Sequence, residues 1–471
     1  MPPFLLPAAP LASLDEYLAT DTGGLGIKRA QEIGPAATID EVVRSGLRGR
    51  GGGGFPTGRK WSGVATQTGT HRYVVCNAAE GEPGTFKDRA RMRSNPYQLV
   101  EGVIIAGFAV DAVEAFICLK ASFGPELEAV RRAVGEFQAA GICSECRIRG
   151  VAGPDEYLYG EEKAMLEVIQ GNAPMPRLLP PHEHGLFATA PQTGWTATDA
   201  EPGHSHRAGH ESNPTLVNNA ETLSNVPHIL AHGAEWFRST GGTDQSPGTL
   251  VCTVVGDVVA PDVGEVELGT PLGTVIDVVG SGLAEGRAVK AVFSGVSNAV
   301  LTAEHLGTPL TYEDFQAAGS GMGAGGYIVY DDTACMVEVA RLFSRFLAVE
   351  SCGQCPPCKM GSQAITERLA RIEAGAGTDQ DVAEIGGWLD RVTDGNRCYL
   401  AVEERVVVAS VLRAFPDEVT AHLDAGGCPR PRQVVFPKVV DLGGGQAVYD
   451  DRYHLKQPDW TYADMPSPGP G

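Results

Sequence analysis

The sequence predicts a chain of three folded parts: an α/β domain, a small α+β domain and an all-α domain. Its 471 residues exceed what one ordinary hydrophobic core organises, so several domains are expected. The spacing of apolar residues changes twice along the chain, near position 245 and again near position 333. The 60 glycines and 32 prolines indicate many turns between short elements.

Residues 1–240 form the predicted α/β domain. Strand-like runs at 72–75 and 115–119 alternate with helix-like stretches at 96–109 and 125–140, and glycine-rich loops lie between them. In layered domains of this kind, ligands bind beyond the carboxyl ends of the strands. We therefore expect the loops of this domain to hold a ligand.

The remaining chain predicts two smaller domains and a tail. Residues 245–332 carry short β-branched runs broken by Gly and Pro, which is typical of a small α+β domain. In residues 333–428 apolar side chains recur at helical spacing, which predicts a bundle of four helices, at 336–349, 364–372, 382–392 and 402–414. Residues 429–471 contain prolines and a glycine run and predict an extended C-terminal arm.

The charge and hydropathy of the chain limit which partners the protein can bind and where in the cell it is expected. A formal net charge of −21 without any long run of Lys or Arg argues against nucleic acid as a partner. No stretch approaches the roughly 20 apolar residues that span a bilayer, so no direct membrane span is expected. The apolar start lacks a preceding basic segment, so we expect a cytoplasmic protein that is peripheral to a membrane only through its partners.

Four cysteines are candidate ligands of an iron–sulfur cluster. Cys352, Cys355 and Cys358 follow C-x₂-C-x₂-C spacing, and Cys398 lies further along the chain. Three closely spaced thiolates and one distant thiolate suit a [4Fe–4S] cluster, whereas zinc sites more often use paired C-x₂-C knuckles. Zinc and ordinary buried cysteines are the alternatives. Cys143 and Cys146 form another C-x₂-C pair that nothing completes.

A glycine run is the candidate site for a phosphate or a flat ring. Gly51, Gly52, Gly53 and Gly54 remove side chains from a loop, so that backbone amides can approach a ligand closely. A flexible linker has a similar composition. Basic residues and aromatic residues flank this run, however, and favour a binding loop: Arg48, Arg50, Arg59, Lys60, Phe55 and Trp61.

Polar groups at a strand end and at a helix start extend this candidate site. Asn77, Glu80 and Glu82 directly follow the strand predicted near 72–75, where an α/β sheet binds its ligand. Glu161 and Glu162 open a predicted helix, where the helix dipole favours negative charge. Taken alone, the pair Glu161–Glu162 is more typical of a helix cap than of a binding site.

These motifs together resemble the NADH-binding flavoprotein subunit of respiratory complex I and its relatives in NAD-dependent formate dehydrogenases and NAD-linked hydrogenases. Residues 45–61 resemble the FMN loop of that family, 350–361 its cluster loop, and 218–222 its Asn-Asn motif. The resemblance covers about residues 23–428. It implies an FMN- and NADH-binding α/β domain, a ubiquitin-like β-grasp domain at 245–332 and a four-helix [4Fe–4S] domain at 333–428.

The resemblance also implies roles for individual residues. The cluster would be held by Cys352, Cys355, Cys358 and Cys398. The nicotinamide nucleotide, NAD(H), would face Glu82, Glu161, Glu162 and Phe55. FMN would be bound by a larger set, namely Gly49, Arg50, Gly51, Gly52, Lys60, Asn77, Glu80, Gly160, Asn218, Asn219 and Thr222.

The implied activity is oxidation of NADH, or reduction of NAD⁺, at FMN, with single electrons relayed through one [4Fe–4S] cluster. No protein residue needs to form a covalent intermediate. The implied partners are a thioredoxin-like [2Fe–2S] subunit and a larger iron–sulfur, molybdenum or hydrogenase-type catalytic subunit.

Four positions depart from the family pattern. Gly63 stands where an aromatic side chain is expected to stack on adenine, and Leu179 and His182 replace a Lys and a Phe. Ala79 replaces an acidic residue expected beside FMN. These departures motivate an alternative function, a non-catalytic electron-wiring or assembly subunit that keeps its cluster and no longer turns over NADH.

Residues 184–212 are longer than expected for the family and rich in histidine. Imidazoles at short spacing, here His204, His206 and His210, can share a metal ion. No cysteine or patterned carboxylate completes such a site. We therefore interpret this segment as a solvated loop that covers the nucleotide cleft or contacts a partner.

Overall fold

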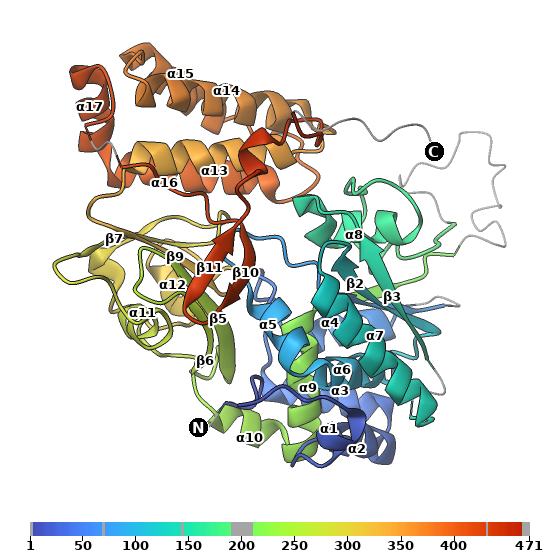
Figure 1. Ribbon diagram of the computed structural model, residues 1–471. Helices are drawn as coiled ribbons and strands as arrows, with labels where there is room; N and C mark the ends of the chain where they lie inside the picture. Colours follow the sequence, from blue (N-terminus) through green and yellow to red (C-terminus); the bar gives the residue numbers. More distant parts are fainter. Residues whose placement is uncertain (1–2, 68–70, 143–145, 190–210, 430–431, 464–471) are drawn as a thin grey trace, which may run out of the picture.

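The computed structural model describes residues 3–67, 71–142, 146–189, 211–429 and 432–463. An α/β domain, a five-stranded sheet with two helices, and a group of helices lie against one another (Figure 1). The architecture is therefore a mixed α/β multidomain fold with a parallel sheet, as the sequence predicts. Among the helices of the described ranges, none combines the length and the hydrophobicity that crossing a bilayer requires.

The sheet of the α/β domain has four parallel strands in the order β3-β2-β1-β4. Because β1 pairs with β2 on one side and with β4 on the other, the strand order reverses between β1 and β4. Ligands of open α/β sheets bind at such a reversal, beyond the carboxyl ends of the strands. The strands are β1 (Tyr73–Asn77), β2 (Glu114–Lys120), β3 (Arg147–Gly153) and β4 (Thr215–Asn219).

Helices cover both faces of this sheet, as the alternation along β1 requires. Val74 and Cys76 pack in the larger core with helices on one face, whereas Tyr73 and Val75 pack with α8 on the other. The helices are α1 (Leu14–Leu18), α2 (Leu25–Ile33), α3 (Pro35–Ser45), α4 (Thr57–Ala65), α5 (Lys87–Ser94), α6 (Pro96–Ala109), α7 (Gly124–Ala139), η1 (Tyr157–Gly160), α8 (Glu162–Ile169), α9 (Ala220–His232) and α10 (Ala234–Ser239).

The second domain is a five-stranded mixed sheet in the order β6-β5-β9-β7-β8. Its β5 and β9 are parallel and its other pairs are antiparallel. One face packs on α11, and the other packs on the first helix of the next domain. The elements are β5 (Thr249–Gly256), β6 (Asp262–Glu267), α11 (Leu272–Gly280), β7 (Val289–Ser294), β8 (Leu301–Thr302), η2 (Ala303–His305), α12 (Tyr312–Ala317) and β9 (Gly326–Asp331).

The third domain has one helix that was not predicted, and the bounds of two predicted helices, 364–372 and 382–392, differ from the prediction. The predicted helix at 364–372 begins earlier, because Pro356 takes the first helical position, where its missing N–H costs nothing. A fifth helix also forms, with Pro416 at its start and few buried residues to reveal it. The helices are α13 (Met336–Glu350), α14 (Pro356–Glu373), α15 (Asp379–Leu389), α16 (Leu400–Ala414) and α17 (Pro416–Ala425).

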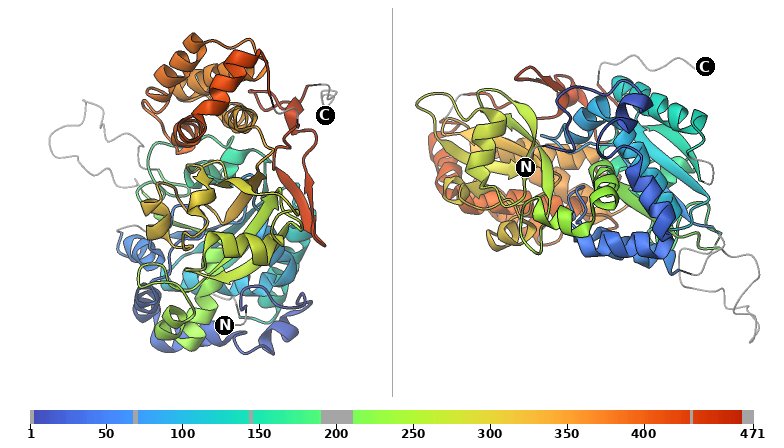
Figure 2. Two further views of the ribbon diagram at one scale, coloured as in Figure 1. Left: turned by 90° about the vertical axis from the view of Figure 1, so that its left-hand side faces the viewer. Right: turned by 90° about the horizontal axis from the view of Figure 1, so that it is seen from below.

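Part of the predicted C-terminal arm, residues 439–449, forms a hairpin that the sequence did not predict. Strands β10 (Val439–Gly443) and β11 (Gln446–Tyr449) pair antiparallel, with Gly444 and Gly445 between them. Both glycines have positive φ, the backbone that a two-residue hairpin turn requires. The hairpin runs from the helical domain down the side of the five-stranded sheet (Figure 2), and η3 (Tyr453–Leu455) follows it.

A buried ion pair fixes the end of this segment to α13. Lys456 Nζ lies 2.8 Å from Glu350 Oε1, and both side chains are almost fully buried. The Tyr453 hydroxyl donates a second hydrogen bond to the same oxygen, at 2.8 Å. Glu350 is the last residue of α13, so this contact joins the C-terminal segment to the chain just before Cys352.

We expect Lys456→Ala to lower the free energy of unfolding by about 3–5 kcal/mol, because it leaves a buried carboxylate without its cation. Lys438 is the matched control. Its ion pair with Asp450, at 3.3 Å, is partly exposed, and Lys438→Ala should cost about 1 kcal/mol or less. Urea unfolding of both variants measures the difference. Equal losses in the two variants would contradict the buried pair's role.

Candidate functional site

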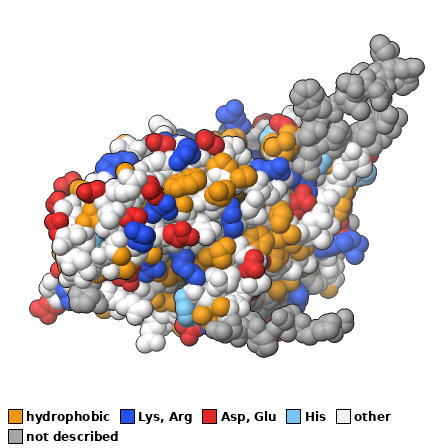
Figure 3. Space-filling model, turned by 90° about the horizontal axis from the view of Figure 1, so that it is seen from above, with side chains coloured by type: hydrophobic (Ala, Val, Ile, Leu, Met, Phe, Trp, Pro, Cys, Tyr) orange, Lys and Arg blue, Asp and Glu red, His pale blue; other side chains and the backbone are white. Residues whose placement is uncertain are grey.

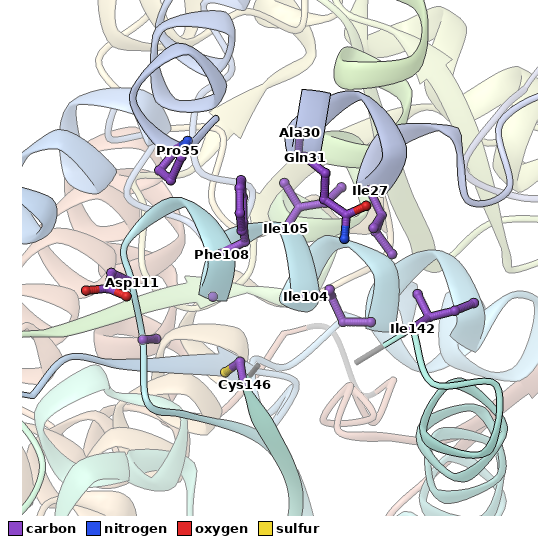
Figure 4. A pocket seen from close by; sticks show the side chains of 12 residues that line it. Ile27, Ala30, Gln31, Pro35, Ile104, Ile105, Phe108, Asp111, Ile142 and Cys146 are labelled. Carbon is purple, nitrogen blue, oxygen red and sulfur yellow. The ribbon is translucent and has the colours of Figure 1, made fainter. Parts of the chain in front are cut away.

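A cavity of about 420 Å³ lies away from the predicted site, between α2 and α6 (Figure 4). Aliphatic side chains such as Ile27, Ile104 and Ile105 line most of it. Its polar lining includes Gln31, Asp111 and Cys146, which do not form a metal-like or catalytic set. This cavity therefore offers no chemistry that the sequence points to.

A cavity of about 610 Å³ opens where the strand order reverses, beyond the carboxyl ends of β1 and β4. Its volume is in the range of cofactor pockets. Ten of the predicted site residues line it: Gly49, Gly51, Phe55, Lys60, Asn77, Gly160, Glu162, Asn218, Asn219 and Thr222. The lining also includes Gly53, Gly54, Arg59, Gly63, Val64, Pro180, Pro181, His182, Thr215 and Val217.

The glycine run forms a closed loop at one wall of this cavity. Gly49 N donates to Phe55 O at 2.9 Å, which closes the loop. A Cβ on Gly51 would lie 2.9 Å from Asn219 Cβ, and one on Gly54 would lie 2.5 Å from the Tyr312 ring. Gly54 also has a φ of +58°, which disfavours other residues. The wall is therefore built from bare backbone, which suits a phosphate or a flat ring.

Arg50 anchors this loop and does not line the cavity, contrary to its predicted role. Its guanidinium donates to Pro247 O at 3.1 Å and reaches the Tyr312 hydroxyl at 3.3 Å, and the side chain is 1% exposed. Its backbone N–H donates to Thr222 Oγ1 at 2.8 Å. Gly52, the other predicted loop residue outside the lining, has a φ of +113°. Arg50 therefore holds the loop in place through hydrogen bonds, and Gly52 permits its left-handed backbone.

Polar side chains from three elements face the cavity. On α4, Lys60 Nζ lies 2.7 Å from Glu162 Oε2 and donates to Val217 O at 2.9 Å. At the end of β1, Asn77 Nδ2 donates to Gly160 O at 2.6 Å. Lys60 thus places a positive charge at the cavity of an acidic protein, where Glu162 pairs with it.

The paired asparagines at the end of β4 have separate structural partners. Asn218 Oδ1 accepts from the indole N–H of buried Trp61 at 2.8 Å. Asn219 caps α9, since its Oδ1 accepts from the backbone N–H of Glu221 at 3.0 Å and of Thr222 at 3.4 Å. These bonds fix both amides at the cavity wall.

Glu80 lies beneath the cavity rather than in its lining. Its carboxylate accepts from the backbone N–H groups at the start of α5, from Asp88 at 3.2 Å and Arg89 at 3.3 Å. Burial raises the pKa of Glu80 to about 7, and the neighbouring Asp88 adds to the rise. The position of Glu80 after β1 correctly predicted that it lies near the cavity. Its side chain, however, points toward the N-terminus of α5.

Glu161 and Glu82 are also absent from the cavity lining. Glu161 caps α8, accepting from Lys163 N and Ala164 N, each at 2.9 Å. Burial raises the pKa of Glu161 to about 7. Glu82 accepts instead from Val296 N in the second domain, at 2.6 Å. The helix-cap interpretation therefore applies to Glu161, while Glu162 alone of the pair faces the cavity.

Tyr157 connects Glu82 to the helical domain. Its hydroxyl lies 2.5 Å from Glu82 Oε2 and 3.1 Å from Glu403 Oε1. One hydroxyl can donate to only one carboxylate, so the second contact needs a protonated carboxyl. Burial, followed by the nearby Glu82, raises the pKa of Glu403 well above its usual value. Glu403 is therefore the group that keeps a proton.

The four predicted cluster cysteines line one separate cavity. Cys352, Cys355 and Cys358 surround the start of α14, and Cys398 precedes α16. None of the four is in a disulfide. Burial raises the pKa of Cys358 to about 11 and that of Cys398 further. Four thiols that line one cavity and form no disulfide fit the ligand set of a metal cluster.

One short segment separates the two cavities. Leu158 lines the cysteine cavity, and Gly160 lines the cavity of the glycine loop. Both belong to η1, the single turn that enters α8. Two residues of backbone span at most about 7 Å. Groups bound in the two cavities would therefore lie on opposite sides of one thin wall.

Two of the departures from the family pattern line the larger cavity. A Cβ on Gly63 would meet nothing within 4 Å, so open space stands where an aromatic ring was expected. His182 lines the same cavity and Leu179 does not. Pro180 and Pro181, which sequence reasoning missed, form part of the wall; their dipeptide signals a turn but no ligand. His204, His206, His210 and Cys143 lie outside the described residues.

One cavity is lined by bare backbone at the point where the strand order of the sheet reverses, and a neighbouring cavity is lined by four thiols. Together they define a class of electron-transfer proteins that have two redox centres. Comparison with known families agrees. Residues 42–228 match the Nuo51 FMN-binding domain, and residues 338–422 match the NADH-ubiquinone oxidoreductase-F iron–sulfur binding region.

Individual relatives match over most of the chain. The F subunit of NADH-quinone oxidoreductase from Streptomyces coelicolor is 36% identical over 88% of this chain and 89% of its own length. The HndC subunit of the NADP-reducing hydrogenase from Solidesulfovibrio fructosivorans is 34% identical over 88% of this chain and 82% of its own. The H₂-reduced NAD⁺-reducing [NiFe]-hydrogenase structure aligns with a TM-score of 0.73 at 31% identity, over 90% of this chain and 68% of that one.

The chain therefore belongs to the family of NADH-quinone oxidoreductase F subunits. It is an NADH dehydrogenase-type oxidoreductase subunit whose cofactors are FMN and a [4Fe–4S] cluster, and it transfers electrons between NADH or NAD⁺ and that cluster.

The raised pKa of Glu403 predicts a pH dependence of stability. The folded protein holds a proton on Glu403 that the unfolded chain releases above about pH 4.3, so this contribution is present at acid pH and is lost as pH rises through the folded pKa. Glu403→Gln keeps a donor for the Tyr157 oxygen, the side-chain NH₂, and removes the titration. Thermal unfolding between about pH 5 and 8 should show a shallower loss in this variant.

The exposed Glu367 provides the control for this measurement. Glu367→Gln should retain the pH slope of the wild type. A Glu403→Gln slope equal to that of the wild type would show that Glu403 is ionised throughout the range.

Proposed function

We propose that the larger cavity is the FMN site and that Cys352, Cys355, Cys358 and Cys398 hold the [4Fe–4S] cluster. The observation that carries this proposal is the η1 wall, with Leu158 on one side and Gly160 on the other. When bound, FMN exchanges a hydride with the nicotinamide and releases electrons singly, which the cluster can accept. The thin wall keeps these two centres within short reach.

The chain's own residues would orient the cofactor rather than react. The bare backbone of the loop at Gly49, Gly51 and Gly53 admits a phosphate or ring edge, and Lys60 supplies the cation that an anionic cofactor needs. The amides of Asn77 and Asn219 already have fixed orientations. Such preorganised groups bind without reorganising, which favours both affinity and correct placement.

The nicotinamide nucleotide would enter beside Phe55 and His182. Phe55 is 50% exposed at the cavity edge, and His182 lines the same cavity. The open space at Gly63 leaves room for a flat base, so His182 takes over the stacking expected of an aromatic residue at position 63. Glu162 is the carboxylate that faces this cavity. Glu82 and Glu161 would act only by positioning the loop and helix behind it.

The cluster side would face a partner. Met360 and Tyr399, which follow the cluster ligands closely in sequence, are 61% and 58% exposed. Seen from above, hydrophobic side chains gather among charged ones on the surface (Figure 3). Exposed apolar groups of this kind favour protein contacts. We propose that electrons leave to a thioredoxin-like [2Fe–2S] subunit and a larger catalytic subunit, in a complex that reaches any membrane only through its partners.

The proposal includes the finer domain types. The mixed sheet of β5 to β9 with α11 crossing it supports a β-grasp domain at 245–332. The helices of 333–428 support a four-helix cluster domain made of α13, α14, α15 and α16, with α17 added to it.

Anaerobic mixing with NADH tests the electron path. The flavin absorbance of the wild type should bleach, and an EPR signal of the reduced cluster should appear. In Cys398→Ser, which removes one ligand, the flavin should still bleach and the cluster signal should be lost. A protein that contains flavin and does not bleach with NADH would contradict the proposal.

A glycine of the loop tests the FMN site. Gly54→Ala places a Cβ 2.5 Å from the Tyr312 ring at a φ of +58°. A left-handed backbone alone costs about 1–2 kcal/mol for a non-glycine residue. Gly54→Ala should therefore weaken FMN binding about tenfold or more, as fluorescence titration of the apoprotein with FMN measures. Gly286, which has a φ of +79° and does not line the cavity, is the matched control, and Gly286→Ala should bind FMN like the wild type.

A further inference from the structure

Three metal-binding side chains meet at a second place in the helical domain. Cys335 caps the start of α13, His422 lies in the last turn of α17, and Cys428 follows α17. Their ligand atoms all lie within 4.8 Å of one another. Cys335 and His422 are buried. These residues are separate from the four cysteines that line the cluster cavity.

The histidine ring is held in the orientation that a metal ligand requires. His422 Nδ1 lies 2.7 Å from Glu418 O, a carbonyl that can only accept, so Nδ1 carries the hydrogen. The other nitrogen, Nε2, then presents a lone pair, and it lies 3.4 Å from Cys335 Sγ. A carbonyl that fixes the tautomer from behind is the usual outer partner of a metal-bound histidine.

The two sulfurs face each other at the start of α13. Cys335 Sγ accepts the backbone N–H of Glu338 at 3.4 Å, at the positive end of α13. It is also hydrogen-bonded to Cys428. Two facing sulfurs and an imidazole form a donor set typical of zinc. In a tetrahedral zinc site, sulfur and nitrogen ligands are about 3.5 Å apart, which the distance between Cys335 Sγ and His422 Nε2 matches.

We propose that Cys335, His422 and Cys428 bind one Zn²⁺ ion, with water as the fourth ligand. Binding would displace the thiol protons and change no oxidation state. The ion would link the start of α13 to the end of α17 and to the origin of the C-terminal segment. From there Arg432 pairs with Asp257, and Val434 N donates to Glu338 Oε1 at 3.0 Å. The site would therefore fix where this segment begins its path across the second domain.

Metal analysis of the full-length protein with its iron–sulfur cluster intact tests the proposal. Elemental analysis by mass spectrometry should find about one zinc per chain in addition to the cluster iron. In the double variant Cys335→Ser/Cys428→Ser, zinc should fall at least tenfold while iron is unchanged. Cys252→Ser, a buried cysteine of β5, is the matched control and should keep its zinc.

Cobalt(II) gives a second readout that does not depend on a variant folding. Wild-type protein purified with reduced thiols and freed of zinc by a chelator, with its iron content verified, should bind Co²⁺ with sulfur-to-cobalt charge-transfer absorption. Zinc retained by the double variant would overturn the proposal. So would wild-type protein that holds iron but neither zinc nor cobalt, or a Cys335–Cys428 disulfide found in its peptides.

Discussion

The hydrogen bonds of Tyr157 join the α/β domain to the helical domain at the segment that separates the two cavities. Its hydroxyl meets Glu82 from the α/β domain and Glu403 from the helical domain, and Glu82 also accepts from Val296 N of the second domain. Three domains thus meet through two side chains, Glu82 and Tyr157, the first residue of η1. A buried carboxyl left there without a hydrogen-bond partner would lower the stability of the fold by more than any single surface contact adds to it.

An acidic chain faces a particular problem in binding an anionic cofactor. With a net charge of −21, no general positive field attracts phosphate. Several cations are buried in structural roles: Lys87 pairs with Glu221 at 2.7 Å, and Arg50 anchors the glycine loop. The cavity is lined by bare backbone and by two cationic side chains, Arg59 and Lys60. The local arrangement of the cavity therefore provides anion-binding groups that the overall charge of the chain does not.

The site was predicted best where spacing alone specifies chemistry. The C-x₂-C-x₂-C run converges on one cavity with Cys398, and the glycine run lines the other. Prediction failed where a side chain could turn either way. Glu80 and Glu161 are close in sequence to residues that line the cavity, but each accepts hydrogen bonds from backbone N–H groups at the start of a helix instead. Every helix has N–H groups in its first turn that find no acceptor within the helix, and a nearby carboxylate readily accepts hydrogen bonds from them.

By itself the sequence determined the kinds of centre this protein carries and the order of its domains, because cysteine spacing, glycine runs and hydrophobic periodicity are local properties of the chain. Tertiary structure decided which side chains line each cavity and which short segment separates the two cavities. It also brought Cys335, His422 and Cys428 together, although Cys335 is distant from the other two in sequence. Such contacts depend on the packing of whole helices, which no local spacing encodes.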